Sequence, residues 1–302
     1  MTGPELRHLR YLLAVAEHGN FSRAAEALYV SQPTLSQQIK QLENALGTQL
    51  LDRSGRTVRL TDAGAAYADR ARRALRELAA AERAIEDVHD LSRGHLRLAN
   101  TPTFTAYLVG PLTAELHMRH PGINLTVVEM SQDAIEAALL ADDLDVGIAF
   151  AGAPAPGIDA VALFTEHLGL VTSGPRAETL PDPLPVRALG DIHLALLSSD
   201  FLTRTHIDEY FAEHHADPRI TVEANSVQAL IEIVRRTPLV TVLPDAVTHD
   251  HPHLTPVPLD PPLPTRTVAL LRRAGGYQSA AASAFMRLAR ELVAARDYAP
   301  AE

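Results

Sequence analysis

Two groups of hydroxyl and amide side chains carry the chemistry that this sequence offers. In the first group, Gln32, Ser36 and Gln37 lie within one or two turns of a predicted helix, and Lys40 adds the only lysine of the chain. The second group consists of threonine, serine and asparagine residues that follow short apolar runs between residues 95 and 226. Such side chains make directional hydrogen bonds, to base edges or to small anions.

Signatures of catalysis are absent from the sequence. The chain has no cysteine, which excludes disulfides, thiolate metal sites and thiol redox chemistry. It also has no phosphate-binding loop ending in Lys-Ser or Lys-Thr, no dinucleotide fingerprint and no Gly-x-Ser-x-Gly elbow. We therefore expect a binding protein that is not an enzyme and that uses no cofactor.

The sequence also predicts no metal site. The histidine pairs near residues 214 and 251 lack the i, i+4 spacing that places two ligands on one helix face. Asp142, Asp143 and Asp145 lack the alternation and the central glycine of a calcium loop. We interpret the three aspartates as a solvated helix end.

Charge is distributed unevenly along the chain. The formal net charge is −10, yet residues 1–62 carry seven basic and six acidic side chains, whereas residues 94–302 carry fourteen basic and twenty-five acidic ones. Contact with a nucleic acid is therefore electrostatically favourable only near the N-terminus. No run reaches the roughly 18 apolar residues of a membrane span, and the first ten residues show no apolar signal stretch, so we expect a cytoplasmic protein with no membrane contact.

Three short helices are predicted to position the first group. The spacing of apolar residues indicates a helix over 5–19. Ser22 is the predicted cap of a second helix, and Ser31 that of a third over 31–47, with Pro33 in its first turn, where the missing amide hydrogen costs little. In the third helix the leucine and isoleucine stripe faces inward and the polar residues face outward. A short turn between two helices, the second with a polar face, suits insertion into a major groove.

A hairpin is predicted next, over 49–60. Two short extended runs flank Ser54 and Gly55, and Arg53 and Arg56 lie at the tip. A basic hairpin tip beside a recognition helix is well placed to contact phosphate or the minor groove. The N-terminal part is therefore predicted to be a winged helix-turn-helix.

A long helix is predicted over 62–91, because this stretch contains no proline and keeps a regular apolar seam. The seam follows spacings of 4 and 3 in alternation and consists of Tyr67, Ala71, Ala74, Leu78, Ala81, Ile85 and Val88. We expect the same helix of a second subunit to cover it, which would present two reading heads to a palindromic site.

From residue 94 onward, short apolar strands alternate with amphipathic helices, which indicates α/β architecture. The length of this part predicts two subdomains with a cleft between them, as in two-lobed periplasmic binding proteins. We predict three regions: a winged helix-turn-helix domain over 1–61, a linker and dimerisation helix over 62–91, and an effector-binding domain over 92–302, with subdomain I at about 92–165 and 265–302 and subdomain II at about 166–264.

The second polar group lies at the ends of predicted strands. Hydroxyls and free amides at helix N-termini can bind an anion without a buried cation, so we expect them to converge on a small anion in the cleft. The candidate effector-binding residues are Thr101, Thr103 and Phe104 after the first strand, Ser131 after the second, and Asn225 and Ser226 after a later one. The alternative interpretation is that all of them are ordinary helix caps.

The head over 21–64 resembles that of LysR-type transcriptional regulators, in the run FSRAAEALYVSQPTLSQQIKQLENALGTQLLDRSGRTVRLTDAG. The long helix and the α/β remainder fit this family over essentially the whole chain. The resemblance implies a homodimer or homotetramer, an effector cleft between two subdomains, and binding to promoter DNA. It further implies that the effector alters DNA bending and thereby recruitment of RNA polymerase, most simply as an activator.

The predicted DNA contacts divide into two kinds. Glutamine can pair with adenine, serine contacts several bases and proline can touch a thymine methyl, whereas cations hold phosphates. Many family members have arginine where Gln37 stands. The candidate DNA-binding residues are Ser22, Arg23, Gln32, Pro33, Thr34, Ser36, Gln37, Lys40, Arg53 and Arg56.

Several segments of the effector-binding part are similar to those of family members that regulate cyanate use, among them RGHLRLANTPTFTAYLVGPL and VEANSVQALIEIVRRT. This similarity implies cyanate as the effector, and Thr101, Thr103 and Ser131 match the family's effector-contacting positions. The alternatives are a regulator of the same family that senses another small metabolite, a two-lobed solute-binding protein, and an α/β enzyme fused to a DNA-binding module.

Overall fold

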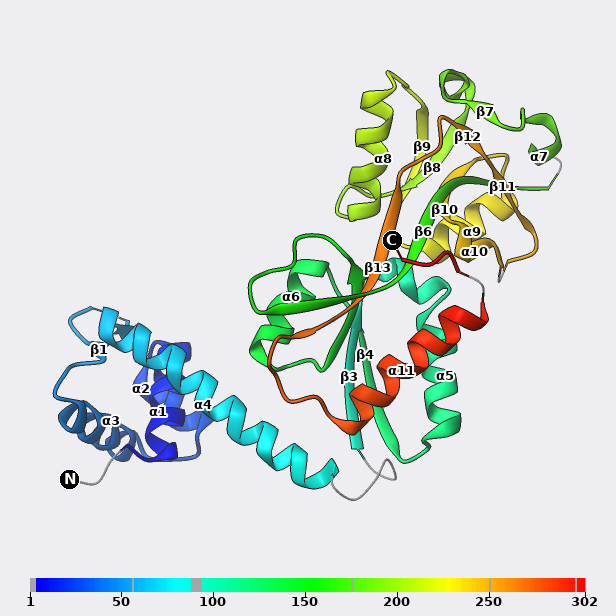
Figure 1. The fold of residues 1–302 in the computed structure, drawn as a ribbon. Helices are drawn as coiled ribbons and strands as arrows, with labels where there is room; N and C mark the ends of the chain where they lie inside the picture. Colours follow the sequence, from blue (N-terminus) through cyan, green and yellow to red (C-terminus); the bar gives the residue numbers. More distant parts are fainter. Residues whose placement is uncertain are drawn as a thin grey trace. The chain divides into compact units, whose positions relative to one another are not determined.

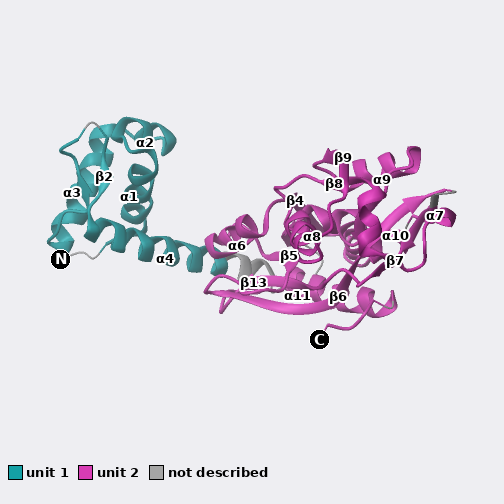
Figure 2. Ribbon diagram, turned by 90° about the horizontal axis from the view of Figure 1, so that it is seen from above, with its two compact units in different colours: residues 1–85 teal, residues 86–302 magenta. Residues whose placement is uncertain are grey.

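The computed structural model describes residues 4–55, 57–87, 94–174, 176–249, 251–296 and 298–301. The chain forms two compact units, residues 1–85 and residues 86–302 (Figure 2). The first unit contains the predicted head together with most of the long helix. The second unit contains the predicted α/β part.

Three helices form the centre of the first unit: α1 (Leu6–His18), α2 (Phe21–Ala27) and α3 (Gln32–Leu46). Leu35, Ile39 and Leu42 of α3 are fully buried in one apolar core with residues of α1 and α2. Gly19 and Gly47 end α1 and α3 in the left-handed conformation, which glycine adopts without steric cost. The predicted arrangement of three short helices is therefore confirmed.

One predicted helix cap is wrong. Asn20, not Ser22, caps α2, because its Oδ1 accepts hydrogen bonds from the amides of Ser22 at 2.8 Å and Arg23 at 3.1 Å. The extended backbone of Asn20 places its short amide side chain over the first turn, as an N-cap requires. The predicted cap of α3 is confirmed, since Ser31 Oγ accepts from the amide of Thr34 at 3.3 Å.

The predicted hairpin is present as two very short antiparallel strands, β1 (Leu51–Asp52) and β2 (Arg59–Leu60). The turn is closed by Asp52, whose Oδ1 accepts hydrogen bonds from the Ser54 amide at 2.9 Å and the Ser54 hydroxyl at 2.7 Å. These two donors hold the pKa of the Asp52 carboxyl below its usual value. The predicted tip residue Arg56 lies outside the described residues.

The long helix α4 spans Asp62–Asp87, and residues 88–93 of the predicted helix lie outside the described residues. The start of its apolar seam does not need a partner, because Tyr67 packs against the core of its own head. Further along the seam Leu78 is 42 % exposed. The prediction that a second subunit covers the seam is thus wrong for its first turns, which the head covers.

The sheet of the second unit begins with three parallel strands (Figure 1). The order β4–β3–β5 continues through two antiparallel strands, β13 and β6. These five strands are β3 (Gly94–Asn100), β4 (Ile123–Glu129), β5 (Val146–Phe150), β6 (Ile158–Ser173) and β13 (Thr265–Arg273).

Helices cover both faces of this sheet: α5 (Val109–Arg119) and α11 (Ala280–Ala295) pack on one face and α6 (Gln132–Ala141) on the other (Figure 1). The two faces follow the alternation of side chains along each strand. Leu98 faces α5 and α11, whereas its neighbour Ala99 faces α6. Strands buried on both faces explain the continuous apolar runs that the sequence shows.

Strands β6 and β13 connect the two subdomains of this unit. The first part of β6 pairs with β13, and its last residues pair with β10 (Thr241–Pro244) and β11 (Leu254–Val257). The sequence pattern predicted short strands, whereas β6 is one strand of 16 residues. The parallel pair β8 (His193–Leu197) and β9 (Arg219–Ala224) continues the second subdomain through a bridge from Leu194 to Val240.

The remaining elements complete the second subdomain and the loops. Its own apolar core includes Leu194, Ile207 and Val242. The elements are α7 (Arg176–Thr179), β7 (Leu184–Pro185), α8 (Leu202–Glu213), α9 (Val227–Arg236), α10 (Asp245–His249), β12 (Leu259–Asp260) and two 3₁₀ turns, η1 (Pro102–Ala106) and η2 (Val186–Asp191).

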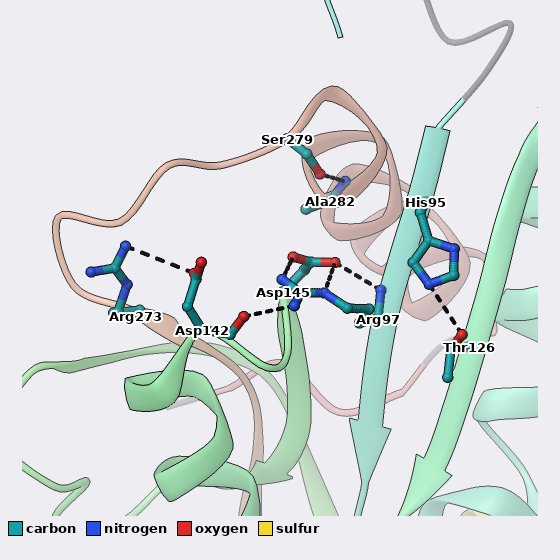
Figure 3. Close-up of polar contacts among 8 residues, drawn as sticks. All are labelled: His95, Arg97, Thr126, Asp142, Asp145, Arg273, Ser279 and Ala282. Carbon is teal, nitrogen blue, oxygen red and sulfur yellow. Dashed lines mark hydrogen bonds and ion pairs between the residues drawn. The ribbon is translucent and has the colours of Figure 1, made fainter. Parts of the chain in front are cut away.

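Of the three aspartates after α6 that were predicted to form a solvated helix end, only Asp143 is exposed, and the prediction is wrong for Asp142 and Asp145. Asp145 forms an ion pair with Arg97, with 2.6 Å between Oδ1 and Nη2, and its other oxygen accepts from the Arg97 amide at 2.8 Å (Figure 3). Asp142 ends α6 in the left-handed conformation, and its carbonyl accepts from Arg97 Nη1 at 2.6 Å. Asp142 and Asp145 therefore hold β3, the start of β5 and the end of α6 together.

Candidate functional sites

The outward side of α3 presents the predicted base-reading residues together. Gln32, Pro33 and Gln37 are exposed and Ser36 is half-buried, while the opposite side of the helix is buried in the core. Thr34 is also exposed, but its Oγ1 lies 2.7 Å from Ser31 Oγ, so its hydroxyl takes part in the helix cap. The polar side chains are thus free to face a ligand because the apolar stripe fixes the rotation of the helix.

A buried histidine orients the middle of α3, and the sequence pattern did not reveal it. His8 Nδ1 accepts a hydrogen bond from the Glu5 amide at 2.9 Å, which leaves the ring proton on Nε2. Nε2 therefore donates to Gln38 Oε1 at 3.1 Å, and Gln38 Nε2 donates to Gln41 Oε1 at 3.1 Å. This chain of hydrogen bonds ties α1 to α3 beside the predicted recognition residues.

The predicted phosphate-binding cations differ in their surroundings. Arg53 Nη2 lies 2.9 Å from Glu43 Oε2, and its guanidinium carbon lies 5.2 Å from the centre of the Phe21 ring. Arg53 is therefore held by the head itself. Arg23 and Lys40 are exposed and form no ion pair among the described residues. Glu43 is a structural residue that the sequence pattern missed.

The second unit contains a cavity of about 550 Å³ at the carboxyl ends of its strands. Of the predicted effector-binding residues, it brings together Thr101, Thr103 and Ser131. The complete lining is Thr101, Pro102, Thr103, Met130, Ser131, Gln132, Asp133, Phe150, Asp200, Phe201, Leu202, Thr203 and Thr205. Residues of both subdomains therefore meet at one site.

Three predicted residues do not line this cavity. Phe104 is fully buried in the core, where its ring centre lies 5.0 Å from that of Phe150, so it supports the cavity wall from behind. Asn225 and Ser226 precede α9, and Ser226 Oγ caps this helix by accepting from the Ala229 amide at 3.4 Å. For Ser226 the alternative interpretation, an ordinary cap, describes the observed contact.

The side chain of Gln132, although it borders the cavity, is engaged by the protein. Its Nε2 donates to the Phe150 carbonyl at 3.1 Å, and its Oε1 accepts from the Phe150 amide at 3.3 Å. Both ends of the amide group therefore pair with the end of β5. Gln132 holds Phe150 in place rather than offering a free hydrogen-bonding group.

The sequence pattern missed the contribution of α8. Thr203 and Thr205 line the cavity from its first turn, and the N-cap residue Phe201 makes no side-chain hydrogen bond to that turn. The signal was available, because hydroxyl residues follow the strand over 193–197, as they do after β3. Neither Thr203 nor Thr205 was among the predicted effector-binding residues.

A buried charged network lies behind the cavity. Arg266 forms an ion pair with Glu166, and its Nη1 donates to Thr203 Oγ1 at 2.7 Å. The Tyr107 hydroxyl donates to Glu166 Oε1 at 2.6 Å. Burial raises the pKa of Glu166, an effect that Arg266 and Tyr107 oppose. Because both carboxyl oxygens accept hydrogen bonds, we assign Glu166 as ionised.

Two threonines of the cavity lining have buried hydroxyls with few partners. Thr101 is 8 % exposed, and its Oγ1 has no hydrogen-bond partner among the described residues. Thr103 is 2 % exposed, and its Oγ1 has one described neighbour, Thr203 Oγ1 at 3.5 Å. A buried hydroxyl without a partner carries a desolvation cost, which a bound ligand would remove. The cavity is therefore a candidate site for a ligand that hydrogen-bonds.

Comparison with known proteins identifies both units. Residues 6–65 match the bacterial regulatory helix-turn-helix proteins of the LysR family, and residues 89–294 match the LysR substrate-binding domain. The chain belongs to the LysR family of transcriptional regulators. The predicted fold, an N-terminal winged helix-turn-helix followed by a two-subdomain α/β domain, is confirmed for this LysR-type regulator.

Relatives with different names match this LysR-type regulator at the same identity. The DNA-binding transcriptional dual regulator OxyR of Escherichia coli strain K12 is 31% identical over 273 residues, 89% of this chain and 90% of OxyR, and a hydrogen peroxide-inducible genes activator of strain O6:H1 matches to the same extent. The activator CmpR of Synechocystis is 31% identical over 237 residues, 78% of this chain and 77% of CmpR. The finer similarity to cyanate regulators therefore stays a prediction.

The whole fold is also similar to a solved structure. A full-length OxyR variant from Pseudomonas aeruginosa superposes with a TM-score of 0.66 at 26% identity, over 97% of this chain and 96% of that one. Among the described residues, no helix is long and apolar enough to cross a membrane, and no cluster of three or more metal-ligating side chains occurs.

Proposed function

We propose that this LysR-type regulator binds promoter DNA through α3 and the β1–β2 hairpin. The exposed polar side of α3 supports this function. Gln32, Ser36 and Gln37 would contact base edges in the major groove, and Lys40 and Arg23 would contact phosphates. Arg53 supports the hairpin through Glu43 and would reach DNA only by giving up that ion pair.

A mobility-shift titration tests this part of the proposal. The full-length chain is expected to retard a fragment of its own upstream region at low ionic strength and to release it as salt rises, because phosphate contacts displace counterions. A duplex of the same length and scrambled sequence serves as the control. Equal affinity for both duplexes would contradict sequence-specific binding.

We further propose that the second unit binds a small monoanion in the 550 Å³ cavity. The observation that carries this proposal is the set of buried hydroxyls on its wall, with Thr101 Oγ1 unpartnered among the described residues. The exposed carboxylates Asp133 and Asp200 also border the cavity and would repel any anion, a dianion more strongly than a monoanion. The apolar side chains of Met130 and Phe150 leave room for a short carbon chain.

Cyanate is the effector that the resemblance implies, and the cavity bears on it through size. A water molecule occupies about 30 Å³ in the liquid, and a three-atom anion is little larger, so cyanate alone would fill a small part of the open cavity. A cyanate response would therefore require the cleft to close around it. Acetate has only one more non-hydrogen atom and would leave nearly as much of the cavity empty, whereas a larger carboxylate such as benzoate would fill more of it.

Thiol-based sensing of peroxide is excluded as an alternative. Among the relatives is a hydrogen peroxide-inducible genes activator, but the present chain contains no cysteine. A peroxide response that depends on a thiol therefore cannot operate here. The alternative effector is a neutral small metabolite, which could also form hydrogen bonds with the hydroxyls of the cavity. Titration with anions and with neutral compounds distinguishes the two.

The effector is tested by titrating the full-length chain with cyanate, acetate, propionate and benzoate in isothermal calorimetry. Saturable binding at one site per chain, without turnover of the anion, is the expected result. Turnover would favour an enzyme, and binding of none of these anions would contradict the anionic effector.

We also propose that the protein acts as a homodimer or homotetramer whose arrangement the effector shifts, so that contact with RNA polymerase changes.

A further inference from the structure

Arg266 is buried directly behind the wall of the cavity. Arg266 and Glu166 are cross-strand partners on β13 and β6, the two strands that connect the subdomains. Arg266 is 6 % exposed and Glu166 is fully buried. The guanidinium carbon of Arg266 lies 3.9 Å from the centre of the Phe150 ring, which is itself part of the cavity wall.

The hydrogen bond from Arg266 to Thr203 determines what the Thr203 hydroxyl can do. A guanidinium only donates, so Thr203 Oγ1 accepts at 2.7 Å and its own proton must point elsewhere. The described neighbour in that direction is Thr103 Oγ1 at 3.5 Å, the far limit of a hydrogen bond. If Thr103 accepts, its own proton is directed onward, and in either case one donor is left for the cavity.

We propose that Arg266 is a positioning residue that turns the hydroxyls of Thr203 and Thr103 towards donation, and that it thereby selects ligands with an acceptor-only head group such as a carboxylate. This inference rests on the proposed binding of an effector in this cavity. Glu166 neutralises Arg266, so the selection acts through the direction of hydrogen bonds rather than through net charge. Tyr107 keeps Glu166 in place by donating to its other oxygen.

A carboxylate and the matching carboxamide distinguish this role from a purely structural one. The two groups have nearly the same shape, but a carboxylate offers only charged acceptors, whereas the amide oxygen is a neutral acceptor and the amide NH₂ needs an acceptor of its own. Hydroxyls that are free to turn would accept from the amide and remove the discrimination. The measured quantity is therefore the ratio of the two dissociation constants. A general loss of stability would weaken the binding of both ligands alike and leave this ratio unchanged.

The experiment uses the full-length chain and three ligand pairs, acetate and acetamide, propionate and propionamide, and benzoate and benzamide, in isothermal calorimetry. The natural sequence is expected to bind at least one carboxylate about tenfold or more tighter than its amide, as the strength of charge-assisted hydrogen bonds implies. Thr203→Val is expected to reduce this ratio to about threefold or less, because the methyl group neither accepts from Arg266 nor donates. Thr203→Ser restores the hydroxyl and with it the ratio.

Two further variants complete the test. The double variant Glu166→Gln/Arg266→Met removes the donor without leaving an unpaired buried charge, and its ratio is expected to fall like that of Thr203→Val. Thr241→Val is the matched control: Thr241 is also fully buried, lies outside the cavity lining, and its Oγ1 has no partner among the described residues. Its ratio is expected to stay that of the natural sequence.

The outcomes separate the two proposals. If the natural sequence binds neither the carboxylates nor cyanate, the anionic effector is wrong and the role of Arg266 falls with it. If it binds cyanate but none of the carboxylates, the selection of carboxylates by Arg266 is overturned while the anionic effector stands. If it binds carboxylates but shows no preference over the amides, or if Thr203→Val keeps the full preference, the role of Arg266 is overturned while the anionic effector stands.

Discussion

Single side chains decide what the outward side of α3 can recognise. Gln37 and Lys40 are both exposed on this side, one helical turn apart. Gln37→Ala is expected to reduce discrimination between the correct base pair and a mismatched one by about 1–3 kcal/mol, since a bidentate amide contact would be lost. Binding of the full-length chain to a series of single-base variants of its operator measures this change.

Lys40→Gln is the matched comparison for Gln37→Ala. A phosphate contact carries no base information, so this variant is expected to weaken binding to all duplexes alike and to lower the slope of log K against log salt by about 0.9. A loss of base preference in Lys40→Gln, or an unchanged preference in Gln37→Ala, would contradict the proposed division of roles.

Thr103 tests the cavity at the same scale. Thr103→Val keeps the shape of this buried residue and removes its hydroxyl. We expect it to abolish the effector response of the full-length chain while leaving its affinity for the upstream fragment nearly unchanged, because the residue belongs to the second unit. Mobility shifts with and without the effector measure both quantities. A variant that still responds would remove Thr103 from the binding site.

At the scale of elements, the junction between the hairpin and α4 depends on one glycine. A Cβ atom at Gly64 would lie 1.9 Å from the Leu50 carbonyl oxygen, and backbone cannot move aside cheaply. Thr61 fastens the same junction, because its Oγ1 donates to the Gln49 carbonyl at 2.8 Å and accepts from the Gly64 amide at 3.0 Å. The helix can therefore begin against the strand only where no side chain intervenes.

We expect Gly64→Ala to destabilise this junction by about 2 kcal/mol or more. Hydrogen exchange of the amides between residues 49 and 66 in the full-length chain measures the loss. Gly110→Ala is the control, since Gly110 also lies in the first turn of a helix but has open space where the methyl group would go. It is expected to be neutral or to stabilise α5 by up to about 1 kcal/mol, so equal effects of the two substitutions would contradict the steric argument.

At the scale of the whole molecule, self-association is expected to depend on the exposed part of the α4 seam. Leu78 is a large apolar side chain at 42 % exposure on a helix whose seam continues beyond the head. Leu78→Asp is expected to lower the oligomeric state, because a charge would be buried at the proposed interface. Sedimentation velocity over a range of concentrations measures it. Arg72→Asp, on the far side of the helix, should leave the oligomer intact.

Much of this molecule was predictable from local patterns. Helical spacing predicted α1, α3 and α4, and the alternation of apolar runs with amphipathic stretches predicted the α/β domain, because each depends on a periodicity that neighbouring residues carry. Thr101, Thr103 and Ser131 were predicted for the same reason, since a strand end followed by hydroxyls is a local signal. Uneven charge along the chain likewise indicated which end can approach DNA.

Tertiary structure alone decided the rest, because contacts between residues far apart in sequence leave no local pattern. The pairing of Glu166 with Arg266 spans 100 residues, and the bond from Arg266 to Thr203 spans 63. The sequence did not reveal the ion pair between Arg53 and Glu43, nor the contact of Tyr67 in the first turns of α4 with the core of the head. Local sequence thus determined which elements form and which residues begin and end them. The packing of those elements together determined which hydroxyl-bearing residues line the cavity and that Arg266 lies next to them.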